Sequence, residues 1–253
     1  MTERSFAERQ EDVRRNLAHI REQMAKACRE AGRSPDEVTL MAVTKTVPPE
    51  VIQTVIDEGV TLIGENRVQE ILEKMPYLDA SFQIDLIGRL QSNKVKYIID
   101  KVCMIQSLDR DSLAQEIDRR AQQKHLRMPV LIQVNIGDEP QKGGVAVDEL
   151  FAFARRCAAL PGLDVRGLMA VMPDLHDETA LRPYFVRMRR LFEQLREEAI
   201  DGTHIEELSM GMSGDYELAA QEGATMVRIG SAIFGARHYP QQDQQILKGD
   251  IQA

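Results

Sequence analysis

VTLMAVTK, residues 38–45, is the first of eight short apolar runs that alternate with amphipathic segments along the 253-residue chain. Several of these runs are apolar almost throughout, as in a parallel sheet whose two faces are both covered. The segments between them repeat apolar residues at i, i+3, i+4 and i+7, which is typical of helices that cover a sheet. The predicted strands are 38–45, 60–66, 82–88, 102–108, 130–136, 165–172, 205–211 and 226–234.

Eight alternating strand–helix units predict an α/β fold, a (β/α)8 or TIM barrel. A doubly wound open sheet is the alternative, and the count of eight units favours the barrel. Apolar residues at helical spacing between Phe6 and Ala27 predict an additional N-terminal helix over about residues 4–31. No Pro/Gly/Ser-rich linker divides the chain, so we expect a single domain over 1–253 with the barrel at about 38–237.

The composition argues against several classes of function. With 32 basic and 40 acidic residues the net charge is −8, which disfavours a nucleic-acid or acidic-membrane partner but allows one local cationic pocket. Three scattered cysteines fit a reducing compartment, and the five histidines have no metal-ligand spacing, so we expect no metal site. The charged start is not a secretory signal and no run approaches about 18 apolar residues, so we expect a cytoplasmic protein without a membrane segment.

Polar and small residues follow the predicted strands at their carboxyl ends, where such barrels carry their chemistry. Lys45 ends the first run. Partial desolvation there would favour the neutral amine that attacks an aldehyde, although a lysine that only marks the strand's exit to water explains it too. Arg228 lies in the apolar last run, where a buried guanidinium must either pair with a carboxylate or meet a polar ligand. Gly230 and Ser231 come next, where these barrels commonly bind phosphate.

Two loops are more ambiguous. In LSMGMSGD, residues 208–215, Ser213 is explained as the cap of the following helix, whose dipole Asp215 would favour. Ser209 and Gly211 are better explained by a ligand. The loop at 139–144 could close over a site, although a solvated turn explains it more simply.

Together these stretches resemble the pyridoxal 5′-phosphate (PLP) homeostasis family, also known as the YggS or proline synthase co-transcribed protein family. The resemblance extends from the N-terminal helix to about Arg237 and implies the barrel of the alanine racemase N-terminal domain, which is fold type III among PLP proteins. The matching segments are AVTKT (42–46), IGENRVQE (63–70), IGRLQSNK (87–94), SLDR (107–110), GLM (167–169), LSMGMS (208–213) and VRIGSAIFG (227–235).

The resemblance implies that PLP is the cofactor and that Lys45 holds it as a Schiff base. Arg228 would face the pyridine nitrogen, and Ser209, Gly230 and Ser231 would hold the phosphate. The expected cofactor-binding residues are Lys45, Asn66, Ser209, Gly211, Arg228, Gly230 and Ser231.

Asn66 would line the cofactor's pocket. The chain departs from the family pattern at two places: Arg89 stands where family members usually carry histidine, and Gln141-Lys142 stands where a Ser-Lys pair is common. Both departures lie outside the implied covalent and phosphate contacts, so they affect the details of the loops.

Arginine at the pyridine nitrogen keeps its proton, so the ring is a weak electron sink for carbanion chemistry. Alanine racemase also takes a second acid/base from a separate domain, whereas this sequence ends soon after its last predicted strand. We therefore expect a monomeric PLP-binding protein that maintains PLP (vitamin B6) and amino-acid homeostasis, with no catalytic residue and little or no turnover. PLP-dependent apoenzymes are the expected transient recipients. The alternatives are a PLP-dependent, racemase-like enzyme and a cofactor-free Schiff-base aldolase that uses Lys45.

Overall fold

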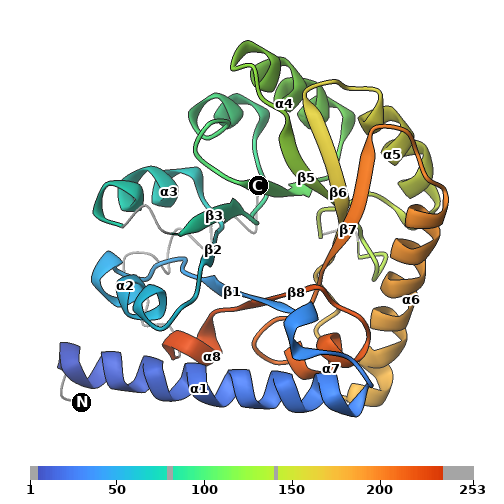
Figure 1. Ribbon diagram of the computed structural model, residues 1–253. Coiled ribbons are helices and arrows are strands. Elements are labelled where there is room, and N and C mark those ends of the chain that lie inside the picture. Colours follow the sequence, from blue (N-terminus) through green and yellow to red (C-terminus); the bar gives the residue numbers. More distant parts are fainter. Residues whose placement is uncertain (1–4, 79–81, 140–141, 236–253) are drawn as a thin grey trace.

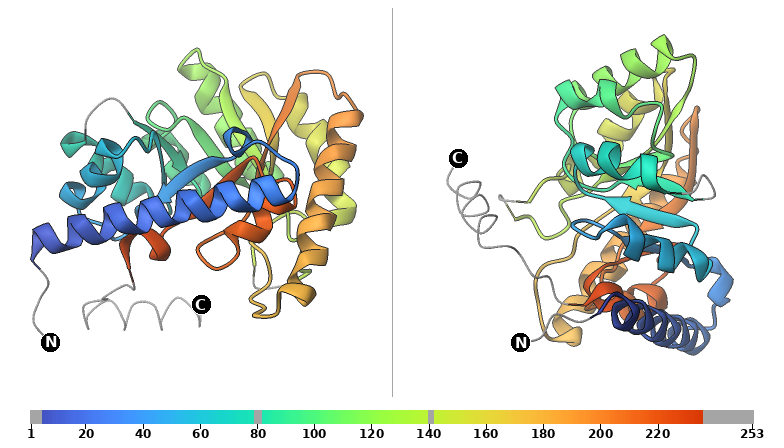
Figure 2. Two further views of the ribbon diagram at one scale, coloured as in Figure 1. Left: turned by 60° about the horizontal axis from the view of Figure 1, so that its bottom comes forward. Right: turned by 90° about the vertical axis from the view of Figure 1, so that its left-hand side faces the viewer.

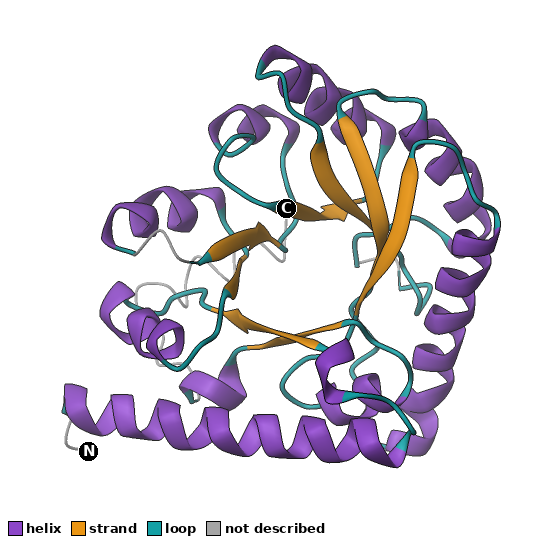
Figure 3. Ribbon diagram, viewed as in Figure 1, coloured by secondary structure: helices purple, strands orange, loops and turns teal. Residues whose placement is uncertain are grey.

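The eight predicted strands close into a barrel (Figure 1). The computed structural model describes residues 5–78, 82–139 and 142–235. Within these ranges the strands run parallel in the order β1-β2-β3-β4-β5-β6-β7-β8, and β1 pairs with β8 to complete the ring. Figure 3 shows helices surrounding this ring of strands. The predicted (β/α)8 barrel is therefore confirmed and the open sheet is excluded.

The described elements alternate as the sequence predicts. The strands are β1 (Thr39–Val43), β2 (Leu62–Glu65), β3 (Gln83–Leu86), β4 (Met104–Leu108), β5 (Met128–Gln133), β6 (Leu163–Met169), β7 (Thr203–Ser209) and β8 (Met226–Ile229). The α-helices are α1 (Phe6–Glu30), α2 (Pro49–Asp57), α3 (Val68–Lys74), α4 (Asp111–Gln123), α5 (Leu150–Ala158), α6 (Glu178–Glu197), α7 (Tyr216–Gln221) and α8 (Ser231–Phe234). Short 3-10 helices are η1 (Pro35–Glu37), η2 (Met75–Tyr77), η3 (Ser92–Tyr97) and η4 (Val147–Glu149).

The end of the last strand differs from the prediction. The apolar run suggests a strand over 226–234, but β8 ends at Ile229 and α8 begins at Ser231. The carbonyl of Gly230 accepts hydrogen bonds from the N–H groups of Ile233 and Phe234, which turns the chain into a helix. Gly230 and Ser231 therefore lie in a sharp strand-to-helix turn. Three predicted elements extend beyond the described ranges: the N-terminal helix at residue 4, the loop at residues 140–141 and the barrel at residues 236–237.

The predicted N-terminal helix is confirmed as α1, Phe6–Glu30. It begins with a capping box, in which Ser5 and Glu8 satisfy each other's backbone N–H groups. Its buried stripe includes Val13 and Leu17, and Figures 1 and 2 show the helix lying along α7 and α8. The Asn16 amide donates to the carbonyl of Ile233 at 2.9 Å. Helix α1 therefore covers the seam where β8 meets β1.

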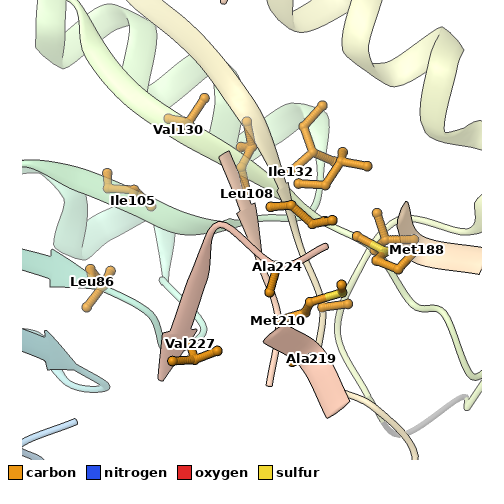
Figure 4. Close-up of a cluster of buried hydrophobic side chains, with 14 of the residues drawn as sticks. Leu86, Ile105, Leu108, Val130, Ile132, Met188, Met210, Ala219, Ala224 and Val227 are labelled. Carbon is orange, nitrogen blue, oxygen red and sulfur yellow. The ribbon is translucent and has the colours of Figure 1, made fainter. Parts of the chain in front are cut away.

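Apolar side chains fill the layer between the strands and the surrounding helices. Ile105 and Val130 on the strands belong to the same buried cluster as Met188 of α6 and Ala219 of α7 (Figure 4). A separate small cluster, Met41, Leu62 and Met226, fills part of the barrel interior. Among the described helices, none has both the length and the apolar character that crossing a membrane requires.

Candidate functional site

Three neighbouring strands bring most of the predicted site residues to one arc of the barrel's carboxyl-terminal rim. In the parallel register, Met41 of β1 lies opposite Arg228 of β8. Val43 of β1 lies opposite Gly64 of β2, and Lys45 and Asn66 each follow two residues later. A side-chain carbon on Gly230 would lie 3.2 Å from the Val43 carbonyl oxygen. Strand pairing therefore gathers Lys45, Asn66, Arg228 and Gly230, which are far apart in sequence.

Lys45 lies in the turn just beyond β1, two residues past the end of the strand at Val43. The turn is fastened on both sides of the lysine. Lys74 Nζ donates to the Thr44 carbonyl at 2.7 Å, and the Thr46 N–H donates to Glu70 Oε2 at 2.6 Å. Thr46 has φ of 62°, which is rare for a β-branched residue and requires such support. The backbone that carries Lys45 is therefore held in one conformation.

The group that fastens this turn is a buried ion network that our sequence reasoning missed. Lys74, at the end of α3, lies 2.7 Å from Glu65 Oε1 and 2.8 Å from Glu70 Oε2. Glu65 is fully buried. Burial raises the pKa of the Glu65 carboxyl, and this effect outweighs the opposing effect of the nearby Lys74 ammonium. Thr44 Oγ1 also donates to Glu65 Oε1. The i, i+4 spacing of Glu70 and Lys74 could have indicated this ion pair from the sequence. Exposed ion pairs on helices have the same spacing, however, so the spacing does not show that the pair is buried.

Asn66 carries an acceptor that the protein leaves unused. Its Oδ1 is buried and has no hydrogen-bond partner in the described part of the chain. Gly88 lies against it: a side-chain carbon at this glycine would be 2.2 Å from the Asn66 carbonyl oxygen, so no other residue fits. A buried acceptor without a partner is costly, and a ligand that brings a hydrogen-bond donor would remove that cost.

Arg228 is 4% exposed, and its guanidinium points into the barrel. Nη1 donates to Ser209 Oγ at 2.7 Å, and Nη2 donates to the Ala170 carbonyl at 2.8 Å. No carboxylate oxygen in the described ranges lies within 4.0 Å of it, so the alternative of a direct structural ion pair does not apply there. Burial lowers the pKa of Arg228 to about 10, against the opposing charge of Asp215. The cation therefore persists at neutral pH and is available to a polar ligand.

Ser213 makes a different contact from the one we expected. Asp215, not Ser213, stands at the N-cap position of α7. The Ser213 hydroxyl instead accepts from the N–H groups of Gly230 at 3.2 Å and Ala232 at 3.1 Å. These hydrogen bonds join the loop after β7 to the turn after β8, so Ser213 lies at the candidate site, close in the chain to the exposed Ser231.

Ser209 and Gly211 are both buried, and the structure gives each of them an internal role. The Ser209 hydroxyl donates to Gln106 Oε1 at 2.7 Å while it accepts from Arg228. Gly211 has φ of 92° and lies where a side-chain carbon would be 2.4 Å from the Ala219 Cβ, which accounts for glycine there. Contacts of these two residues with a ligand stay predictions.

Asp85 of β3 carries a buried carboxyl inside the barrel, toward the end at which the strands begin. It is 2% exposed, and Oδ2 accepts from Gln106 Nε2 at 2.7 Å. Burial, with a smaller contribution from the charge of Glu207, raises the pKa of Asp85 to about 7, although the hydrogen bond from Gln106 opposes this. Folded Asp85 therefore keeps a proton that an unfolded aspartate releases near pH 4.

This pKa gives a signed prediction for stability. Because the folded state binds the Asp85 proton more tightly, this group lowers the free energy of unfolding as pH rises from about 4 to about 7, by up to roughly 4 kcal/mol. Asp85→Asn should flatten that part of the profile, which urea unfolding at pH 5, 6, 7 and 8 measures. Asp100→Asn is the control, since Lys124 and Lys101 lower the pKa of Asp100 to about 2 and its contribution changes only in acid. Parallel wild-type and Asp85→Asn profiles would contradict the prediction.

Comparisons with known proteins agree with this architecture. Residues 15–238 match the family described as alanine racemase, N-terminal domain. A pyridoxal phosphate homeostasis protein of Aquifex aeolicus is 45% identical over 224 residues, which cover 88% of this chain and 97% of the relative. The chain belongs to the pyridoxal phosphate homeostasis family. The resemblance that the sequence motifs suggested is thereby confirmed.

Two solved structures extend the comparison to this family's fold. A crystal structure of an unknown protein from Bifidobacterium adolescentis has a TM-score of 0.87 at 35% identity and covers 92% of this chain and 98% of its own. PipY of Synechococcus elongatus, a structure with PLP bound, has a TM-score of 0.78 at 31% identity and covers 88% of this chain and all of PipY. Both of these proteins therefore share the fold of this chain over most of its length.

Proposed function

We propose that this protein binds PLP at the carboxyl ends of β8, β1 and β2 and maintains the intracellular PLP supply and amino-acid homeostasis. The observation that carries the proposal is the buried Arg228 cation, which has no direct carboxylate partner in the described ranges and lies on β8, the strand that pairs with β1 below Lys45. The names of the relatives and the PLP-bound PipY structure support it.

The residues present fit the chemical groups of PLP. Arg228 offers N–H donors for the pyridine nitrogen, and the Asn66 amide offers its unused acceptor to a hydroxyl. Lys45 supplies the amine for a Schiff base with the aldehyde. PLP, when bound, supplies an aldehyde and an electron-withdrawing ring.

In this proposal the phosphate lies at the turn after β8. The N–H groups of Gly230 and Ala232 converge on the Ser213 hydroxyl, and Ser231 adds an exposed hydroxyl beside them. Backbone N–H groups and hydroxyls at a glycine turn suit a phosphate oxygen. We therefore assign the phosphate to Ser213, Gly230 and Ser231, and we assign Ser209 to the support of Arg228.

We further propose that turnover is slow or absent. A ring nitrogen that accepts from Arg228 stays unprotonated, because the guanidinium keeps its proton. Such a ring withdraws electrons less strongly than one that is protonated opposite a carboxylate. The same proposal has the protein acting in the cytoplasm as a monomer that passes PLP to PLP-dependent apoenzymes, which light scattering and a transfer assay with an apoenzyme would test.

The deciding experiment is an absorbance spectrum with intact mass before and after borohydride reduction. The proposal expects a yellow protein that gains one phosphopyridoxyl group after reduction and leaves free L-alanine unracemised. Rapid racemisation of L-alanine by the pure protein would contradict the proposal and support a PLP-dependent racemase. A colourless protein that condenses with small aldehydes or ketones would contradict the proposal and support a cofactor-free aldolase.

A further inference from the structure

A line of hydrogen bonds crosses the interior of the barrel beneath the proposed PLP site. It links Asp85 of β3, Gln106 of β4, Ser209 of β7 and Arg228 of β8. Each step is 2.7 Å between heavy atoms. The bond between Gln106 and Ser209 joins strands that are not neighbours in the ring, so these side chains span the interior. All four residues are at most 4% exposed.

The donors in this line all point the same way. Arg228 Nη1 donates to Ser209, the Ser209 hydroxyl donates to Gln106 Oε1, and Gln106 Nε2 donates to Asp85. An arginine has no acceptor, and Asp85 has no donor once it is ionised above about pH 7, so above that pH the two ends fix the order of the middle groups. The Gln106 amide must therefore turn its oxygen toward Ser209, which leaves a lone pair of the Ser209 hydroxyl for Arg228.

The lower end of the line reaches a cavity at the opposite mouth of the barrel. This cavity has a volume of about 380 Å³ and is lined by the first residues of several strands, among them Thr39, Gln83 and Met226. The charged or titratable groups that face it are Asp85, Cys103, Arg166 and Glu207. Asp85 therefore lies between a water-accessible mouth and the amide that it orients.

We propose that Gln106 is a positioning residue for Arg228 and that Asp85 acts by orienting the Gln106 amide. The inference rests on the proposed function, because the guanidinium so placed is the one that would meet the pyridine nitrogen. Gln106 touches neither PLP nor Lys45 in this proposal. It holds the Ser209 hydroxyl, which together with the Ala170 carbonyl sets the plane of the guanidinium. A guanidinium held in one plane binds a planar ring with less loss of freedom.

The test compares Gln106→Met with Thr54→Val. Both variants replace a fully buried polar side chain by an apolar one of similar size, but Thr54 lies on α2, where it accepts from Gln10. Titration with PLP at pH 8, followed by visible absorbance, should give a dissociation constant up to about tenfold higher for Gln106→Met, because this variant lacks the hydrogen bond that holds the Ser209 hydroxyl. Thr54→Val should bind PLP as the wild type does.

Two further measurements separate positioning from a general loss of structure. In ligand-free protein, the ¹⁵N-bound Nη protons of Arg228 should be resolved in the wild type and averaged by rotation in Gln106→Met. Asp85→Asn should weaken PLP binding about threefold in the wild type and not at all in the Gln106→Met background, since it acts only through that amide. If Gln106→Met does not fold, Asp85→Asn with the Nη spectrum serves as the test.

Each outcome decides one claim. Unchanged PLP affinity with a well-folded Gln106→Met would overturn the positioning role, as would additive effects of the two substitutions. If the wild type binds no PLP, the proposed function fails, while the ligand-free spectrum of Arg228 still supports or overturns the positioning of its guanidinium.

Discussion

Lys45→Ala should eliminate the borohydride-stable adduct between PLP and the protein. The reason is that in the proposed site Lys45 supplies the amine, at the rim where β8, β1 and β2 end. The turn that carries it is held on both sides by Lys74 and Glu70. Without that amine, PLP keeps only its noncovalent contacts, and reduction with borohydride cannot fix it to the chain. We expect the visible absorbance of the loaded protein to change and the adduct mass to vanish.

The matched control is Lys142→Ala, a lysine in the loop after β5. Its ammonium is 2.7 Å from Glu139 and 3.1 Å from the Met172 carbonyl, outside the residues assigned to PLP. This variant should be as yellow and as readily trapped as the wild type. A Lys45→Ala protein with an undiminished adduct would show that another lysine holds PLP and that the site has been assigned to the wrong strand end.

Lys74→Met should destabilise the protein by about 3–5 kcal/mol at pH 8, which is typical when one partner of a buried pair is removed. Glu65 would remain fully buried with its Thr44 hydrogen bond but without its cation. The pKa of Glu65, already raised by burial, would rise further. Because a folded-state pKa above the unfolded value costs stability as pH rises, the deficit should be smaller at pH 5 than at pH 8. Urea unfolding at the two values measures it.

Lys26→Met serves as the control for Lys74→Met, since the exposed Lys26 is 3.9 Å from Glu30 on α1. Its effect should stay within about 0.5 kcal/mol. Adding Glu65→Gln to Lys74→Met should recover part of the loss, because it removes the uncompensated charge. A deficit that is equal at both pH values, or a double variant less stable than Lys74→Met, would argue that lost packing rather than the buried charge is responsible.

The barrel could be predicted because its determinants are local and repeated. Each apolar run and each helical repeat could be recognised from its own residues. Eight strand–helix units then fit one closed topology. The last run shows where this reading fails: GSAIF continues the apolar pattern of β8, yet the hydrogen bonds to the Gly230 carbonyl turn it into α8. Apolar character alone does not distinguish a short buried strand from a short buried helix.

The site was predictable only in part. Lys45, Arg228 and Gly230 stood out because a charge or a glycine at the end of an apolar run is unusual. Lys74 did not, because its partner Glu65 is nine residues away and the contact exists only after α3 packs against β2. Ser213 was misread because serine before a helix is so often a cap, whereas its partners are the N–H groups of a turn that comes later in the chain.

The pairing of β8 with β1, which α1 covers, affects the order in which the protein can fold during its synthesis. Strand β1 is synthesised early but pairs with the last strand, and α1 packs on α7 and α8, which are also late. Loop-closure entropy opposes such distant pairing until the intervening units exist. Lys45 and Arg228 therefore come together only when nearly the whole polypeptide has left the ribosome. On the proposed site, a nascent or truncated chain would lack the pocket, and PLP would bind only to finished molecules.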